Sequence, residues 1–286
     1  MKKRYKYIGS ILIVVVFLAL VSIWYSYNYI KINEYEMEHD SVKSDISVLV
    51  IADLHDHEFS SGNTRLVSKI QDIHPDLILM AGDFLNENSK DSHVPIEFIE
   101  NLGTDIPVYF SLGNHEVAYM EAGHPELIDE LKKAGAIVLE KEYEDIEVNG
   151  TPLRIGGMYD WAFGAGDSEN EAAMAKPEVK AFLEDFQNTD RLKIMMAHRP
   201  DSFIFGDASK AWDIDLVVSG HLHGGQVVLP FAGGLYGGDQ GFFPKYIHGM
   251  YEKDNMNIFI TSGLGSHTQL LPRFNNPPEI AVINLH

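Results

Sequence analysis

Residues 213–226 read DIDLVVSGHLHGGQ, an apolar run that ends in two histidines flanked by glycines. The apolar part, with Leu216, Val217 and Val218 at its centre, predicts a buried strand. At its carboxyl end, the glycines allow a turn in which His221 and His223 face the same cavity. A single pair of this kind is more often structural than metal-binding. The case for a metal site therefore depends on how the other strands end.

Several other predicted strands also stop at a histidine, a carboxylate or an amide. In open α/β sheets, ligands bind outside the carboxyl ends of strands, so a shared position at strand ends is itself evidence. Each side chain alone has an ordinary explanation as a turn or core residue. Five strand ends with such side chains together favour one shared metal site. The candidate ligands are Asp53, His55, Asp83, Asn114, His198, His221 and His223.

The donor atoms of these residues indicate the class of metal. The chain has no cysteine, which excludes thiolate sites and disulfides. Oxygen and imidazole donors suit manganese, iron or zinc better than calcium, which takes oxygen ligands only. Asp83 has no second ligand beside it, so its carboxylate is the natural bridge between two ions that clamp a phosphate together. We expect two divalent or trivalent transition-metal ions.

The order of the predicted elements indicates an α/β fold. In the first half, strands alternate with helices, as in right-handed crossovers of a largely parallel sheet, and short strands dominate the second half. The predicted strands are 45–52, 76–81, 106–112, 137–139, 143–148, 153–157, 192–197, 214–218, 227–229, 257–261 and 280–285. The predicted helices are 63–73, 93–102, 125–134 and an interrupted one at 169–186, after a loop at 159–168. We predict a four-layer αββα sandwich, with two central sheets flanked by helices.

The first thirty residues have the composition of a membrane anchor. Four cations within residues 2–6 precede an apolar run, which is followed by Trp24 and three tyrosines. A helix over residues 8–29 is long enough to cross the hydrocarbon core. Basic residues before it and an aromatic belt after it predict a cytoplasmic N-terminus and a catalytic part outside the cytoplasm.

A cleaved signal peptide is the alternative for this segment, but no small-x-small site follows the apolar run. We therefore predict a single-pass transmembrane anchor in the cell membrane at 1–30, a polar stalk at 31–44 and a catalytic domain at 45–286. The formal net charge is −20, and four of the 22 basic residues precede the apolar run. Such an acidic domain repels nucleic-acid phosphate and anionic lipid head groups over the long range, so no nucleic-acid partner is expected. Bound cations would have to receive an anionic substrate.

The strand-end motifs resemble the signature of the calcineurin-like metallophosphoesterase superfamily, and residues 220–245 and 272–280 are similar to its bacterial membrane-associated branch. The motifs stand here as Asp53-Leu54-His55, Gly82-Asp83, Gly113-Asn114-His115-Glu116, His198 and Gly220-His221-Leu222-His223. The resemblance implies two metals and a shared hydroxide as the nucleophile. One metal would be held by Asp53, His55, Asp83 and His223, and the other by Asp83, Asn114, His198 and His221.

The resemblance also implies roles for residues that are not ligands. His115 would stabilise a phosphoryl oxygen or protonate the leaving group, and Glu116 would orient His115. Arg199 and Arg273 are weaker candidates, as guanidinium groups that could bind phosphate. His57 could be a base on the substrate side or a surface residue, and the second interpretation is favoured. The glycine-rich stretch 233–241 has no GxGxxG motif or Walker lysine, so we expect a loop that lines the site.

The sequence therefore favours a phosphoesterase that hydrolyses monoesters or diesters outside the cytoplasmic membrane. Tethering favours a lipid-linked or cell-envelope substrate. A protein phosphatase or a cyclic-nucleotide phosphodiesterase would use the same metal centre, but the predicted location argues against both. An inactive metal-binding envelope scaffold predicts damaged ligands, whereas every ligand-type position and His115 are intact.

Overall fold

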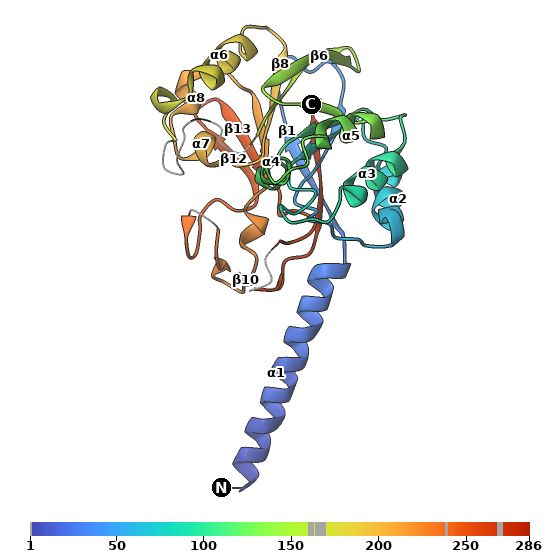
Figure 1. The fold of residues 1–286 in the computed structure, drawn as a ribbon. Coiled ribbons are helices and arrows are strands. Elements are labelled where there is room, and N and C mark those ends of the chain that lie inside the picture. Colours follow the sequence, from blue (N-terminus) through green and yellow to red (C-terminus); the bar gives the residue numbers. More distant parts are fainter. Residues whose placement is uncertain (1, 160–162, 164–169, 238–239, 268–270) are drawn as a thin grey trace.

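Two six-stranded sheets form the centre of the computed structural model, which describes residues 2–159, 163, 170–237, 240–267 and 271–286 (Figure 1). The first sheet has the order β1 (Lys31–Met37), β14 (Glu279–Leu285), β2 (Ile46–Ile51), β3 (Leu77–Ala81), β4 (Val108–Ser111) and β5 (Ile137–Leu139). The second has the order β12 (Gly249–Lys253), β13 (Met256–Ile260), β9 (Leu216–Ser219), β8 (Leu192–Ala197), β7 (Thr151–Met158) and β6 (Glu142–Val148). A small hairpin joins β10 (Val228–Leu229) to β11 (Gly233–Gly234).

Helices cover the outer faces of both sheets. The first sheet is covered by α2 (Thr64–Ile73), α3 (His93–Leu102), α4 (Asn114–Glu121) and α5 (Leu127–Ala134), and the second by α6 (Pro177–Phe186), α7 (Asp201–Ile204) and α8 (Ala208–Ala211). Single 3-10 turns lie at Ser61–Asn63, Ala172–Met174 and His223–Gly225.

Alternation along the strands builds three apolar layers between these elements. In β2, Leu49 and Ile51 join the cluster under α2, α3 and α5, whereas Val48 and Val50 join the cluster between the sheets. A third cluster lies under α6, α7 and α8. Three apolar clusters thus separate four layers, and the predicted αββα sandwich is confirmed.

Parallel strands occupy the middle of each sheet. In the first sheet, β2, β3, β4 and β5 run parallel, and in the second, β7, β8, β9 and β13 do. Their carboxyl ends therefore lie at the same edge of each sheet. That edge carries the residues that the sequence singles out.

The predicted stalk at 31–44 is wrong, because its first half is a strand. β1 pairs in parallel with β14 from Lys31 opposite Glu279 to Met37 opposite Leu285. Val42 then packs against the core between the sheets. This segment therefore belongs to the folded domain, and only two residues separate it from the N-terminal helix.

The N-terminal helix α1 (Lys2–Asn28) projects from the domain as an isolated helix (Figure 1). Its segment Tyr7–Asn28 has a mean hydropathy of 2.6 and is long and apolar enough to cross a membrane. A signal sequence has the same properties.

Besides β1, the helices α4, α7 and α8 and the strands β11 and β12 have no counterpart among the predicted elements. The interrupted helix at 169–186 is a 3-10 turn followed by α6, which begins at Pro177, where the missing N–H of proline costs nothing. Most of the loop at 159–168 lies outside the described residues.

Candidate metal centre

Tight turns at the strand ends bring the predicted ligands together. Asp53, His55 and Asp83 follow β2 and β3 with positive φ angles of 56°, 49° and 58°. Gly113, before α4, allows the loop after β4 to approach them, since a Cβ atom there would lie 2.2 Å from Asp83 Oδ1. A larger residue at position 113 would displace the Asp83 carboxylate.

The ligand-type atoms form three groups in which all atoms lie within 4.8 Å of one another. Asp83 belongs to two of the groups, and its Oδ2 lies 2.9 Å from His198 Nε2 and 3.9 Å from His55 Nε2. His221 and His223 fall into different groups, as the sequence predicts. The groups are Asp53, His55 and His223; His55, Asp83 and His115; and Asp83, His198 and His221.

Buried polar atoms without a hydrogen-bond partner gather in this cluster. Among the described residues they include His55 Nε2, Asn114 Oδ1, His198 Nε2 and His223 Nδ1. His198 Nε2 is close to Asp83, yet it does not have hydrogen-bond geometry toward it. An unpaired buried polar group costs about 1–3 kcal/mol, and metal coordination would remove this cost. The residues therefore fit bound metal ions.

Hydrogen bonds orient two of the candidate ligands. His55 Nδ1 lies 3.1 Å from Asn86 Oδ1, while the Asn86 amide donates to His55 O and to Asp56. His198 Nδ1 lies 2.7 Å from Ala81 O. Since both partners are acceptors, Nδ1 carries the proton in the neutral ring of each residue, and Nε2 then has the lone pair that a metal ion needs. Asn86 is a functional residue that the sequence reasoning missed.

His115 has the opposite orientation. The backbone N–H of Glu87 donates to His115 Nδ1 at 3.0 Å, so in the neutral ring the proton is on Nε2. That nitrogen lies 3.9 Å from Asp83 Oδ2. Burial lowers the pKa of His115, which favours the neutral ring. His115 thus presents an N–H group and no free lone pair, which suits a hydrogen-bond donor rather than a metal ligand.

Glu116 does not orient His115, in contrast to the prediction. Its carboxylate is buried and accepts the backbone N–H groups of Asp83, Phe84 and Gly113 at 2.7–2.8 Å. The backbone N–H of His115 donates to Asp83 Oδ1 at 2.9 Å. Glu116 therefore fixes the turn that carries Asp83 and does not touch the reacting groups.

Burial and charge shift the pKa values of the cluster in different directions. Burial would lower the pKa of His198, but the carboxylates of Asp83 and Asp53 outweigh it and raise the pKa to about 10. Burial raises the pKa of Asp53 to about 7. Burial and the Arg273 charge lower the pKa of His223 to about 3. Metal binding would have to displace the proton from His198, so metal affinity should fall at low pH.

The two predicted phosphate-binding arginines have different environments. Arg273 is fully buried, and its guanidinium donates to the carbonyl groups of Ser262, Gly265 and Asn276. The prediction that Arg273 binds substrate is therefore wrong, because its N–H groups hold the loop before β14. Arg199 follows His198, and its Nε lies 3.5 Å from Asp201 Oδ2.

Two further histidines lie outside the predicted ligand set. His57 is partly buried, not a surface residue, and its Nε2 lies 3.1 Å from the carbonyl oxygen of Tyr27 in α1. His267 was missed, and its ring lies 4.5 Å from that of His115. It lies in the loop after β13 and not directly at the strand end, so the strand-end rule does not identify it.

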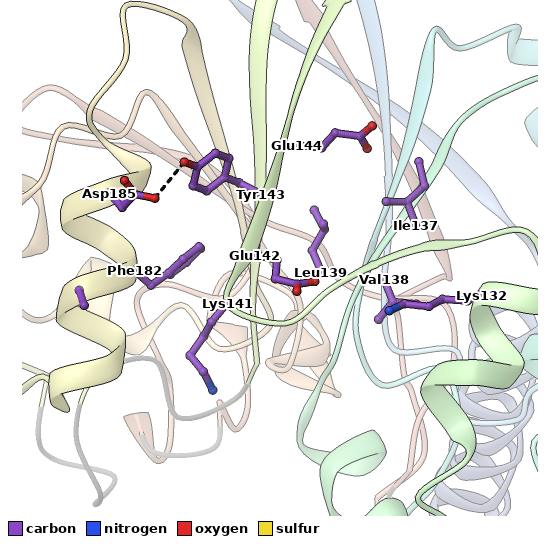
Figure 2. A pocket seen from close by; sticks show the side chains of 11 residues that line it. Lys132, Ile137, Val138, Leu139, Lys141, Glu142, Tyr143, Glu144, Phe182 and Asp185 are labelled. Atoms are coloured by element: carbon purple, nitrogen blue, oxygen red, sulfur yellow. Dashed lines mark hydrogen bonds between the residues drawn. The ribbon is translucent and has the colours of Figure 1, made fainter.

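A cavity of about 290 Å³ opens over the cluster. It is lined by Asp83, Asn114, His115, His221, Leu222, His223, Gln226, Tyr236, His267 and Leu271. Tyr236 belongs to the glycine-rich stretch that was expected to line the site. A larger and more open hollow of about 820 Å³ lies between β5, β6 and α6, where Tyr143 donates to Asp185 at 2.9 Å (Figure 2). None of the three ligand groups lines that hollow, so the smaller cavity is the candidate active site.

Comparisons with known proteins agree with this geometry. Residues 46–225 match the profile described as calcineurin-like phosphoesterase, and this range includes every candidate metal ligand. A metallophosphoesterase of Campylobacter jejuni is 28% identical over 281 residues, which cover 96% of this chain and 68% of that protein. The phosphodiesterase YaeI of Escherichia coli is 28% identical over 246 residues, which cover 83% of this chain and 81% of that protein. The metallophosphoesterase YkuE of Bacillus subtilis is 28% identical over 225 residues, which cover 77% of this chain and 71% of that protein.

Proposed function

Because the chain belongs to the calcineurin-like phosphoesterase family, we propose that two transition-metal ions bind at its strand ends and serve the hydrolysis of phosphate monoesters or diesters. The observation that carries this proposal is the convergence of unpartnered buried ligand atoms around the Asp83 carboxylate. The mixture of imidazole, carboxylate and amide donors favours manganese, iron or zinc.

The proposed ligands divide as the motifs imply. Asp53, His55 and His223 hold one ion, Asn114, His198 and His221 hold the other, and Asp83 is shared. When bound, the ions would activate a water molecule and neutralise the charge of the phosphate. The protein contributes a fixed arrangement, because Glu116 holds the Asp83 turn through three backbone N–H groups.

His115 supplies a hydrogen bond to the substrate. Its Nε2–H faces the cavity, and the N–H of Glu87 fixes the ring. An N–H group held in place before the reaction stabilises negative charge that develops on a phosphoryl or leaving oxygen. Arg199, beside His198, is proposed as a second phosphate contact.

We also propose that α1 anchors the enzyme in the cell membrane, with the N-terminus in the cytoplasm and the active site outside. The length and apolarity of α1 support an anchor, and the basic residues before the apolar run support this orientation. Phosphate esters of lipids or of the cell envelope are then the substrates within reach.

The test uses full-length protein in detergent, freed of metal and then supplied with manganese. Bis(p-nitrophenyl) phosphate and p-nitrophenyl phosphate serve as soluble diester and monoester probes. We expect metal-dependent hydrolysis that Asp83→Asn reduces by at least about 100-fold, since the shared ligand loses its charge. Asp105→Asn, at an exposed position, is the matched control. Equal turnover in the two variants would contradict the assignment of the site.

A further inference from the structure

The segment 227–247 differs in composition from the rest of the chain. It reads VVLPFAGGLYGGDQGFFPKYI and has only two charged residues, Asp239 and Lys245, in a chain with 42 acidic residues. Four of its aromatic side chains are exposed, and Phe231 is completely so. We call Phe231, Tyr236, Phe242 and Phe243 the aromatic surface.

The backbone holds these rings out of the core. Phe231 and Phe243 have positive φ angles of 68° and 55°, a conformation that is unfavourable for bulky residues. The Phe243 N–H donates to Leu235 O at 3.0 Å, so the backbone at Phe243 is held although its side chain is exposed. Backbone strain combined with exposed apolar rings indicates a surface that meets an apolar partner.

The hairpin of β10 and β11, whose turn carries Phe231, is connected to the N-terminal helix. The side-chain amide of Asn275 donates to Val228 O in β10, and the Asn275 backbone N–H donates to Ser22 Oγ in α1. β10 lies at the end of the domain from which α1 projects (Figure 1). Asn275 therefore connects β10 to α1.

Helix length fixes the depth of this contact if α1 spans a bilayer. Tyr7 follows the last basic residue before the apolar run. The helix rises about 22 Å from Tyr7 to Ser22, whereas the hydrocarbon core is about 30 Å thick. Ser22 would therefore lie within the outer part of the bilayer. The loop bonded to Ser22 would then touch or enter the headgroup region, at the level of the exposed Trp24 and Tyr25.

The candidate active site lies close to the same level. Ser26, buried near the end of α1, accepts the N–H of Asn276, and the Asn276 amide donates to His223 O at 2.7 Å. Tyr236 of the aromatic surface lines the cavity. A single residue thus links the anchor helix to a loop that carries a proposed metal ligand.

We propose that the aromatic surface inserts into the outer interface of the bilayer that α1 spans, so that the cavity receives phosphate esters carried on membrane lipids. This inference rests on the proposed anchoring function of α1. Exposed phenylalanines with few charges nearby suit the apolar edge of a lipid interface. The connection of β10 to α1 through Asn275 favours lipid over a protein partner.

Cysteine labelling tests the insertion, because the chain has no cysteine and each label is unique. Full-length Phe231→Cys and Phe242→Cys carry an environment-sensitive fluorophore in phosphatidylcholine vesicles that contain spin-labelled lipid. Val15→Cys in α1 reports the span, and Glu184→Cys on α6, far from α1 (Figure 1), is the exposed control. We expect blue-shifted, lipid-quenched emission at positions 231, 242 and 15, and water-like emission at 184.

The results separate this inference from the proposed function. Water-like emission at 231 and 242 with lipid quenching at 15 would overturn the insertion alone. A protein would then be the expected partner of the aromatic surface. Water-like emission at 15 as well would overturn both the anchoring and the insertion. Neither result depends on turnover, so the hydrolysis of soluble diesters stays a separate test of the metal centre.

Discussion

At the residue scale, hydrogen bonds decide which nitrogen of each neutral histidine ring is left for the candidate metal centre. Acceptors at Asn86 and Ala81 leave the neutral rings of His55 and His198 with a lone pair on Nε2. A donor at Glu87 leaves His115 with an N–H group at the same atom. The residue type alone does not distinguish these cases, because the distinction comes from hydrogen-bond partners that are distant in the sequence. The partner is 31 residues away for His55, 28 for His115 and 117 for His198.

His115→Ala should separate catalysis from metal binding. Loss of a fixed N–H donor should lower kcat by about 100- to 1000-fold, while both metals stay bound. His198→Ala should lower the metal content itself. Turnover assays and elemental analysis measure both effects, with His93→Ala, which is exposed, as the control. Loss of metal in His115→Ala would show that His115 is a ligand instead.

Asn86→Ala should weaken metal binding without removing a ligand. The His55 ring would lose the acceptor that fixes its proton on Nδ1, which typically costs about 10- to 100-fold in metal affinity. A manganese titration of the metal-free protein measures the change. Asn188→Ala, on the surface, should leave the affinity unchanged. An unchanged metal affinity in Asn86→Ala would show that Asn86 does not support metal binding through His55.

At the scale of elements, the sequence predicts the central strands well and the edges poorly. β2, β3, β8 and β9 are apolar runs buried on both faces, so their composition alone identifies them. β1 reads KINEYEM and is largely exposed, as edge strands often are. In sequence, such a strand has the same polar composition as a stalk. Only its pairing with β14 shows that it belongs to the sheet.

The buried carboxylate of Glu279 ties β1 to the rest of the sheet. It accepts hydrogen bonds from Asn33 and Tyr35 in β1 and from Thr261 and the Ser262 N–H after β13. His248 Nε2 lies 2.8 Å away. Burial alone would raise the pKa of Glu279, but the bonds from His248 and its other partners outweigh burial and lower the pKa to about 2.

This pKa shift predicts how the free energy of unfolding depends on pH. The folded-state pKa lies below the ordinary value of 4.5, so the stabilisation is present above pH 4.5 and is lost as the pH falls toward 2. The loss is at most about 3 kcal/mol. Urea unfolding at pH 6 and pH 3 should show a smaller difference in Glu279→Gln than in the wild type. An equal pH dependence in the two proteins would contradict the linkage.

Short helices explain another gap in the sequence prediction. α4 has eight residues and no pronounced apolar stripe, so periodicity does not predict it. Its first residues nevertheless carry Asn114, His115 and Glu116. The GNHE motif identifies these positions, but the role of Glu116 depends on the turn after β3, which only the folded chain brings near. The residues are therefore predictable and the role is not.

At the scale of the whole molecule, the order of the elements predicts the layer architecture, and the strand ends predict the candidate ligands. Parallel strands place their carboxyl ends on one edge, and the structure brings the candidate carboxylate and imidazole ligands together there. Arg273 shows where this reasoning fails. Its partners are carbonyl groups of a loop, and a sequence does not show which groups a buried guanidinium will meet. His267 reaches the site from a loop, and its distance from the end of β13 explains why the strand-end pattern does not identify it.

The two-metal assignment leads to the most direct test of the account. Manganese is titrated into metal-free full-length protein while the hydrolysis of bis(p-nitrophenyl) phosphate is followed. If Asp83 joins two ions, turnover should stay low through the first equivalent of metal and rise with the second. Full turnover at one equivalent, or no turnover at any metal concentration, would contradict the account.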